Sequence, residues 1–509
     1  MKHVKTIFIY LTILLYVAFN SKSYSQESKY SKRSFIQEVD SVLKLIKNKW
    51  NVPGLAIGVV KDGEVIFKKG YGFRNLKSQL PVTTETLFST GSSTKSFTAN
   101  GIGILVDEGG LSWDDRVKKH LPEFELKDSL WSDQATVIDI LSHRTGLPAH
   151  NMMQFAICDQ YGRDGIVERI KYLDLSESFR TVPQYQNQMY QVATVLIEKL
   201  SGKSWEDFTR ERILDPLDMK NTTFPGSNEY IHSNNIATRY AYTPDGSYVP
   251  ARPLGNMMRE ISGSGSIFSN VDDMCNWLIF NINEGTFKNK RMVSQEAMGT
   301  LLAPHIPISR KLGNTMLMHS FALGWDVMAY RGHLLYNKPG GYIGITSQVV
   351  FIPDKEIGLI LFANLRSQMA YWIITLEILD RLLGFEPMSY VEKDWSQEEG
   401  YIERVVKNLQ SLSKPEHTTE PTIPSNKMTG KYRNNGYGDL SVYIKDGNLR
   451  LNYVNDTTLI HFNENTYQSF QLFEYNKYKF ITNTKGIVTG ISVPFESKVN
   501  DIVFMKMEN

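Results

Sequence analysis

Ser92 and Lys95 are the first residues in this chain whose types and spacing could do chemistry. They lie in the stretch FSTGSSTKSF at positions 88–97, and a spacing of three puts both side chains on one face of a helix. A serine hydroxyl is a poor nucleophile until a neighbouring base removes its proton. A lysine amine can be that base when burial or a nearby cation lowers its pKa from about 10.4. The pair therefore predicts a nucleophilic serine with a lysine partner.

The spacing alone has little weight, because it recurs at Ser41/Lys44 and at Ser411/Lys414, where solvated helix positions are expected. What distinguishes Ser92 is its place at the start of a predicted helix, which runs to Glu108 and ends at a pair of glycines. A side chain there feels the positive end of the helix dipole. The simpler alternative is that Ser92 only caps that helix.

Two further polar groups follow along the chain. Tyr185-Gln186-Asn187 stands just before an amphipathic helical pattern, and Lys338-Pro339-Gly340-Gly341 leads into an apolar strand pattern. Tyr-x-Asn spacing also occurs at 432–434 and 453–455, within a β-rich region near the C-terminus. Each group is therefore a weak signal alone and gains weight from the order of all three.

In that order, Ser92-x-x-Lys95, Tyr185-x-Asn187 and Lys338-Pro-Gly resemble the motifs of class C serine β-lactamases, penicillin-binding D,D-peptidases, and their esterase and aminopeptidase relatives. The phrases GLAIGVVKDGEVIFKKGYGFRN, DEGGLSWDDRVKKHLPEF, ILSHRTGLP and SGSGSIFSNVDDMCNWL are similar to connecting segments of that superfamily. The resemblance covers about 35–384. The tail from about Met428 resembles a small β domain of unknown function that is often attached to such hydrolases.

The resemblance implies a role for each motif residue. Ser92 would be the acylated nucleophile, Lys95 its proton partner, and Tyr185 the group that passes the proton between nucleophile, leaving group and acceptor. The substrate-binding residues would be Asn187, on the acyl side of the substrate, Lys338, as a second cation, and Gly340 and Gly341. The backbone N–H groups of Ser92 and Gly341 would form the oxyanion hole.

The chain departs from the resemblance at Pro339. β-Lactamases and peptidases often have a hydroxylated residue in the middle of Lys-x-Gly, and proline has neither that hydroxyl nor a backbone N–H. This weakens the case for recognition of a carboxylate on a β-lactam. Gln186, where esterase-like relatives often have serine, leaves Tyr185 and Asn187 in place.

The expected activity is that of a serine acyl-enzyme hydrolase of esterase, amidase or peptidase type. One alternative is an acyltransferase, in which an alcohol or amine replaces water as the acceptor. Another is a β-lactamase, or a penicillin-binding sensor or scaffold with slow deacylation. The expected partner is a small-molecule or peptide acyl substrate.

The elements that must position these residues follow from hydrophobic periodicity. A helix is predicted at 34–50 and another at 371–384, and hairpins are predicted around Lys61-Asp62-Gly63 and Pro353-Asp354. A mostly helical middle runs to about Ser204. The fold class is therefore α/β (α+β): an antiparallel sheet built from both ends of the region and flanked by helices, with an all-helical part beside it. After 428 the alternation of apolar and polar residues predicts a small all-β sandwich or barrel.

Domain boundaries follow from shifts in composition along the 509 residues. Residues 1–25 have Lys2 and Lys5 ahead of an apolar run, followed by small residues at Ser23 and Ser25, which is the layout of a signal peptide. The apolar run is too short to cross a bilayer. The chain is thus expected to be exported, periplasmic or secreted, with no stable membrane span after cleavage. The hydrolase domain is assigned to 26–385, a helical segment and Pro/Thr/Ser-rich linker to 386–427, and the β domain to 428–509.

Composition narrows the remaining function classes. A formal net charge of +2 gives no reason to expect nucleic acid as a partner. No cofactor and no metal are expected, since His143 and His150 lack a metal-binding motif and are interpreted as structural. Cys158 and Cys275 could pair or stay as buried thiols, and the sequence does not predict the oligomeric state.

Overall fold

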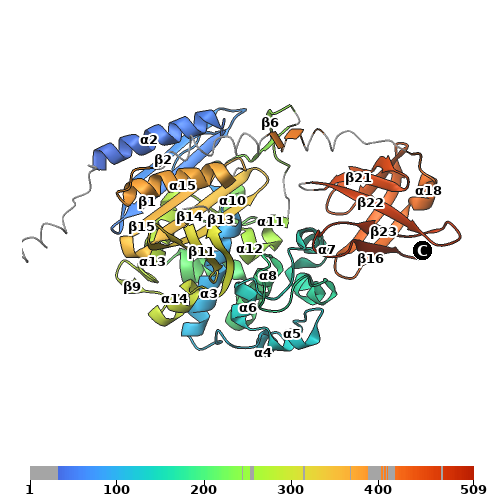
Figure 1. Cartoon of the computed structure of the whole chain (residues 1–509), viewed down its shortest axis with the longest axis horizontal. Helices are drawn as coiled ribbons and strands as arrows, with labels where there is room; N and C mark the ends of the chain where they lie inside the picture. Colours follow the sequence, from blue (N-terminus) through green and yellow to red (C-terminus); the bar gives the residue numbers. More distant parts are fainter. Residues whose placement is uncertain are drawn as a thin grey trace, which may run out of the picture.

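The computed structural model describes residues 32–508, apart from 244, 253–256, 313–315, 367, 388–402, 405, 408–409, 411–418 and 472–473. The predicted signal peptide and much of the predicted linker lie outside the described residues. Figure 1 shows a larger N-terminal part built on one sheet and a smaller β part beside α7, at the red end of the colour scale.

A nine-stranded antiparallel sheet forms the centre of the N-terminal part in the described ranges. The predicted hairpins and the closure of the sheet by both ends of the region are confirmed, because the last long strand pairs with the first from Leu55↔Ala363 to Lys61↔Ile357. The strands, in spatial order, are β10 (Ile306–Leu312), β11 (Met316–Phe321), β12 (Asp326–Tyr330), β13 (His333–Tyr342), β14 (Ile345–Ile352), β15 (Ile357–Ala363), β1 (Gly54–Lys61), β2 (Glu64–Asn75) and β3 (Leu80–Pro81).

The turn between β1 and β2 follows from its sequence. Asp62 and Gly63 have φ angles of 51° and 75°, and a two-residue hairpin loop with both residues in the left-handed region matches the twist of its strands. Glycine adopts that conformation freely and aspartate tolerates it.

Each face of the sheet packs on its own hydrophobic cluster. In β1 the alternate residues Leu55, Ile57 and Val59 join the cluster under α2 (Lys32–Lys49) and α15 (Gln368–Leu382), while Ala56 and Val60 join the cluster on the opposite face. α13 (Val271–Ile282) covers that opposite face. The two expected helices at 34–50 and 371–384 therefore lie together on one side of the sheet (Figure 1).

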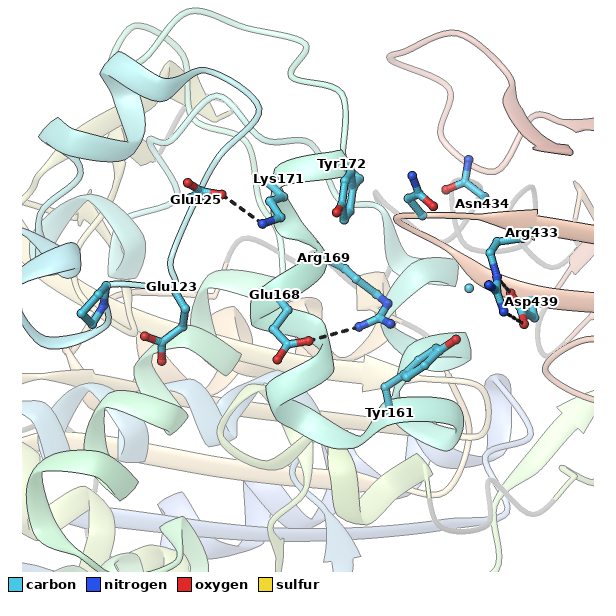
Figure 2. Close-up of a pocket in the computed structure, with 13 residues that line it drawn as sticks. Glu123, Glu125, Tyr161, Glu168, Arg169, Lys171, Tyr172, Arg433, Asn434 and Asp439 are labelled. Atoms are coloured by element: carbon cyan, nitrogen blue, oxygen red, sulfur yellow. Dashed lines mark hydrogen bonds and ion pairs between the residues drawn. The ribbon is translucent and has the colours of Figure 1, made fainter.

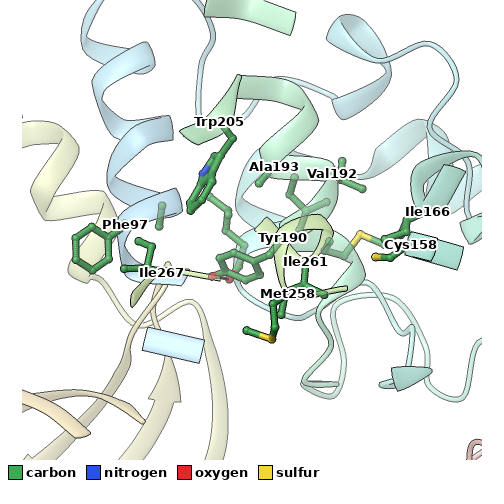
Figure 3. Packing of buried hydrophobic residues seen from close by; sticks show 14 of the residues in the cluster. Phe97, Cys158, Ile166, Tyr190, Val192, Ala193, Trp205, Met258, Ile261 and Ile267 are labelled. Carbon is green, nitrogen blue, oxygen red and sulfur yellow. Dashed lines mark hydrogen bonds between the residues drawn. The ribbon is translucent and has the colours of Figure 1, made fainter. Parts of the chain in front are cut away.

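The helical region surrounds α3 (Thr94–Asp107), a helix whose described residues are nearly all buried. Figure 3 shows Phe97 from α3, Tyr190 from α8 and Ile267 in the same packed cluster. The other elements of this region are α4 (Val117–His120), α5 (Ser129–Gln134), α6 (Val137–Leu141), α7 (Asn151–Arg169), α8 (Gln188–Ser201), α9 (Trp205–Thr209), α10 (Asn228–His232), α11 (Met257–Glu260), α12 (Ser262–Gly265), α14 (Gln295–Leu302) and the short pairs β4 (Phe88–Ser89) with β7 (Phe268–Ser269), β5 (Tyr240–Tyr242) with β6 (Tyr248–Pro250), and β8 (Thr286–Phe287) with β9 (Lys290–Arg291).

The C-terminal part is a nearly closed antiparallel barrel, one of the two predicted forms. Its edge strand β19 contacts β21, and the side chain of Gln471 bridges them by donating to Thr457 Oγ1 at 3.1 Å. A short helix, α18 (Ser425–Met428), precedes strands in the spatial order β19 (Asp456–Thr458), β18 (Asn448–Asn452), β17 (Gly438–Lys445), β16 (Gly430–Asn434), β24 (Ile502–Lys506), β23 (Val488–Val493), β22 (Glu474–Thr482), β21 (Thr466–Gln471) and β20 (Ile460–Asn463).

Cys158 and Cys275 are both buried and are not joined by a disulfide. Burial raises the pKa of the Cys275 thiol to about 12, which makes this thiol unreactive at neutral pH. The alternative of a stabilising disulfide is therefore excluded.

Candidate active site

Ser92 lies in a short 3₁₀ turn, η1 (Gly91–Ser93), between β4 and α3. The next residue fixes this turn to the sheet, since Ser93 Oγ donates to the carbonyl oxygen of Lys338 at 2.7 Å. Ser347 Oγ, from β14, donates to the carbonyl oxygen of Thr90 at 2.6 Å. Ser92 itself is partly exposed, so its hydroxyl is held at an accessible point on a rigid turn.

Lys95 lies one turn into the helix and is completely buried. Its Nζ donates to Asn187 Oδ1 at 2.6 Å and to the carbonyl oxygen of Ser264 at 2.7 Å, and it lies 3.4 Å from Ser92 Oγ. The two short contacts are to atoms that can only accept a hydrogen bond. They use two N–H groups of the amine and leave its third position toward the serine.

The charge state of Lys95 follows from its surroundings. Burial, and secondarily the charge of Lys338, hold the pKa of Lys95 well below its usual value. A buried amine without a counter-ion loses its proton more readily than a solvated one. The second cation expected from Lys338 is thus close enough to act on Lys95.

Tyr185 lies between the two lysines. Lys95 Nζ and Lys338 Nζ are each 5.2 Å from the centroid of its ring. Burial raises the pKa of Tyr185, although the charge of Lys338 and a hydrogen bond with Ser92 lower it in part. One edge of the side chain stays open, with 38% of its surface exposed. The phenol is therefore protonated at neutral pH and faces the serine.

Two glycines allow the strand β13 to approach the serine turn. A Cβ on Gly340 would lie 2.0 Å from the carbonyl oxygen of Thr90 and 2.9 Å from the backbone nitrogen of Ser92. A Cβ on Gly91, whose φ is 50°, would lie 2.9 Å from the backbone nitrogen of Gly341. No side chain fits in either place, which brings the backbones of Ser92 and Gly341 next to one another.

The structure thus brings the predicted residues Ser92, Lys95, Tyr185, Asn187, Lys338, Gly340 and Gly341 into one site. Asn187 is engaged at both ends, because its Nδ2 also donates to Asn151 Oδ1 at 3.2 Å. Its amide therefore holds Lys95 in place.

Sequence reasoning missed three neighbours of this site. Ser264 contributes a backbone carbonyl from the SGSGS run, a stretch that in the sequence resembles only a connecting segment. Asp326 Oδ1 lies 3.6 Å from Lys338 Nζ, and no motif marks this aspartate. His143 packs with its ring centroid 4.4 Å from that of Tyr185, and neither of its ring nitrogens has a hydrogen-bond partner among the described residues.

A polar groove of about 790 Å³ lies elsewhere, between α7 and the β barrel. Figure 2 shows that most of its charged side chains are paired with one another: Lys171 with Glu125, Arg169 with Glu168, and Arg433 with Asp439. Glu123 pairs with Lys199, outside the groove. These internal pairs leave no convergent set of polar groups, so the groove is a weak candidate for chemistry.

No group of three or more His, Cys, Asp and Glu residues could hold a metal ion in the described ranges. No helix in those ranges is both long and apolar enough to cross a bilayer.

Two family models match the chain. The family model described as Beta-lactamase matches residues 42–374, and one described as a domain of unknown function (DUF3471) matches residues 414–506. The chain is 30% identical to the unguisins hydrolase ungD' of Aspergillus campestris over 430 residues, which cover 80% of this chain and 77% of that protein. It is 25% identical to Protein flp of Staphylococcus aureus over 334 residues, which cover 65% and 64% of the two chains.

Solved structures show the same fold. The octameric penicillin-binding protein homologue from Pyrococcus abyssi superposes with a TM-score of 0.60 at 23% identity, covering 92% of this chain and 99% of that one. The crystal structure of SurE superposes with a TM-score of 0.57 at 17% identity, covering 94% and 100%. The matched family model spans most of the chain and includes every residue of the site, and the chain therefore belongs to the beta-lactamase family.

Proposed function

We propose that this protein is a serine hydrolase that forms an acyl-Ser92 intermediate and passes the acyl group to water. The observation that carries the proposal is the environment of Lys95 Nζ. Two acceptors, at 2.6 and 2.7 Å, take two N–H groups, and the third position of the amine lies 3.4 Å from Ser92 Oγ. In the neutral amine that position is a lone pair, which is what a general base needs.

In the acylation step, Lys95 takes the hydroxyl proton as Ser92 Oγ forms a bond to the acyl carbon. The negative charge that develops on the acyl oxygen is stabilised by the backbone N–H groups of Ser92 and Gly341, and loss of one such donor typically costs about 10² to 10³ in rate. Tyr185, which is protonated and hydrogen-bonded to Ser92, donates a proton to the leaving group as the old acyl bond breaks. Tyr185 recovers a proton from the protonated Lys95.

Deacylation reverses these roles. Water loses a proton to the site as its oxygen bonds to the acyl carbon, and the bond to Ser92 Oγ breaks. Ser92 recovers its proton, so that the enzyme is regenerated and one acid is released.

The surroundings of Lys338 support neutral acyl groups as substrates. Its charge is already partnered by Asp326 at 3.6 Å, and Pro339 offers no hydroxyl or N–H to a carboxylate. A simple ester or amide avoids the cost of placing a second carboxylate beside Asp326. The proposal therefore favours esters, amides and peptides over β-lactams. The name of the 30% identical relative, a hydrolase, supports hydrolysis as the reaction type.

We also propose that the chain is exported, on the three-part layout of residues 1–25. The mature protein recovered from cells should begin at Gln26 by intact mass. A product that keeps Met1 would contradict export by this segment.

Time-resolved intact mass spectrometry tests the hydrolase. Protein mixed with a short-chain activated ester should show a transient adduct of one acyl group, which disappears as product forms and is absent in Ser92→Ala. Ser41→Ala is the matched control, because Ser41 also has a lysine three residues later but lies exposed on α2. It should acylate like the wild type.

Two results would contradict the proposal. An adduct that persists in Ser92→Ala would place acylation elsewhere. A penicillin adduct that clears faster than the ester adduct would reverse the proposed order of substrates.

A further inference from the structure

The C-terminal barrel is packed against α7. Gln160, on α7, donates from Nε2 to the carbonyl oxygen of Asp439 and accepts from the N–H of Asp439, both at 3.0 Å. Gly438 has a φ of 76°, and a Cβ there would lie 2.6 Å from Gln160 Oε1, so only glycine allows this approach. Among the described residues, α7 and the barrel are therefore in close contact at this point.

The same interface reaches His150, the residue that precedes α7. Its backbone N–H donates to Glu496 Oε2 at 3.0 Å, and its Nδ1 lies 2.7 Å from Tyr437 Oη. Its Nε2 lies 2.9 Å from the carbonyl oxygen of Asp174. A carbonyl can only accept, so Nε2 carries the proton and Nδ1 accepts from the tyrosine. The backbone N–H and both ring nitrogens of His150 thus have hydrogen-bond partners, and two of these three partners belong to the barrel.

These contacts hold His150 in an unfavourable conformation. Its φ and ψ are 39° and 41°, in the left-handed region that non-glycine residues seldom adopt. Burial lowers the pKa of His150, so the ring is neutral at neutral pH. A strained backbone persists only where its surroundings determine it. Here Glu496 and Tyr437 are part of those surroundings.

From His150 the contacts lead to Lys95. Gln188 Nε2 donates to the carbonyl oxygens of Ala149 and His150 at 2.9 and 3.0 Å, and Gln188 Oε1 accepts from the backbone N–H of Asn187 at 3.1 Å. Asn151, the residue after His150, accepts a hydrogen bond from Asn187 Nδ2. The other end of the Asn187 amide is the acceptor that holds Lys95 Nζ.

A second contact lies beside Tyr185. Lys498, two residues after Glu496, donates from Nζ to Gln184 Oε1 at 2.5 Å. Gln184 directly precedes Tyr185, and its backbone N–H donates to the carbonyl oxygen of His143 at 2.8 Å. One short segment of the barrel therefore contacts both His150, from which hydrogen bonds lead to Lys95, and Gln184, which precedes Tyr185.

We propose that the C-terminal barrel positions the proton-transfer groups of the active site, with Glu496 and Tyr437 acting through His150 on Asn187 and Lys95. The inference rests on the proposed acyl-Ser92 chemistry. Glu496 and Tyr437 are positioning residues, since neither touches Ser92. A misplacement of about 1 Å at a reacting group can cost about 10² in rate, so a small shift at His150 would be measurable.

The test compares variants of the full chain by the rate of adduct formation at Ser92 with an activated ester, followed by intact mass. Glu496→Ala and Tyr437→Phe each remove one bond to His150, and each should slow acylation by about 10- to 100-fold. Gln160→Ala removes two hydrogen bonds from the same interface but none of the contacts that lead through His150 to Lys95. This variant should acylate at the wild-type rate. Glu496→Gln keeps an acceptor for the His150 N–H and should stay within a factor of about three of wild type.

A second readout separates positioning from loss of structure. The groups that face Lys95 are Lys338 on β13, Tyr185 before α8, Tyr190 in α8, and His143 after α6. If Asn187 moves, water reaches the Lys95 ammonium and stabilises it, so the acidic limb of the acylation profile should move to higher pH in Glu496→Ala. Melting temperatures identify any variant that has failed to fold, and Tyr437→Phe then serves as the second probe.

The outcomes are distinct from those of the proposed function. A wild-type protein that forms no Ser92 adduct overturns the hydrolase itself. A wild type that acylates, with Glu496→Ala and Tyr437→Phe equally fast and with unchanged pH profiles, overturns only the positioning role. Equal slowing in Gln160→Ala and Glu496→Ala would also overturn it, because the barrel would then act through the interface as a whole.

Discussion

Lys95 and Asp139 are both completely buried, and the protein treats their charges in opposite ways. Asp139, on α6, accepts from Arg180 Nη2 at 2.6 Å, from Arg144 Nε at 2.5 Å, and from both the N–H and the hydroxyl of Thr136 at 2.8 Å. Burial alone would raise the pKa of Asp139, but the bond from Arg180 and the other partners lower it overall. Lys95 has a side-chain amide and a backbone carbonyl as its acceptors, and its strongest charged neighbour is another cation.

The difference separates a structural charge from a reactive one. A buried ion that is fully paired stays ionised, and removing it leaves its partners as unpaired buried charges, which destabilises the fold. A buried amine without a counter-ion gives up its proton, which makes it a base at neutral pH. Asp139 therefore keeps its charge to hold its arginine partners, and Lys95 loses its charge to act as a base. The following variants test each side of that comparison.

The largest expected effect is on turnover in Lys95→Met. The change removes the base but keeps an unbranched apolar chain in the cavity, so acylation of Ser92 should fall by about 10² to 10⁴. Release of product from an activated ester measures the loss. Turnover close to that of the wild type would show that another group activates the serine.

Asp139→Asn should destabilise the fold with little change in the rate per folded molecule. The variant leaves two arginines without a buried counter-ion, at a cost of about 3 kcal/mol, the lower end for a broken buried pair, because Arg180 can reach water. Because the folded pKa of Asp139 lies below its unfolded value, its contribution is present above the unfolded pKa and is lost as pH falls through the folded one. Urea unfolding at neutral and at acidic pH measures both, and the gap between variant and wild type should narrow in acid.

The smallest expected effect is a shift in pH dependence in Lys338→Met. The charge of Lys338 lowers the pKa of Lys95, so its removal should raise that pKa and move the acidic limb of the rate profile to higher pH. The profile of kcat/KM against pH measures the shift. A limb that moves to lower pH would contradict the assignment of Lys95 as the base.

Much of the scaffold could be predicted from the sequence, because it follows from local patterns. Alternation along β1 and the Asp62-Gly63 turn specify a hairpin, and the helical periodicity at 34–50 specifies α2. The sequence does not distinguish a sandwich from a barrel, because closure depends on contacts between β19 and β21, near opposite ends of the sheet, and alternation within each strand does not specify such contacts.

The motif residues could be named from sequence, but the electrostatics around them could not. Ser264 acts through its backbone carbonyl, which no side-chain type reveals, and Asp326 meets Lys338 only after two strands pair. The contact between the barrel and His150 could not be predicted either, because Glu496 and His150 are separated by 346 positions and no local pattern joins them.

The most direct test of the account is the pH dependence of Ser92 acylation in a single turnover with a neutral activated ester. The rate should rise with pH through one ionisation that lies well below 10.5, the ordinary value for lysine, and that ionisation should disappear in Lys95→Met. A wild-type profile that rises only near 10.5, or the same ionisation persisting in Lys95→Met, would contradict the claim that a neutral, unpaired Lys95 activates the serine.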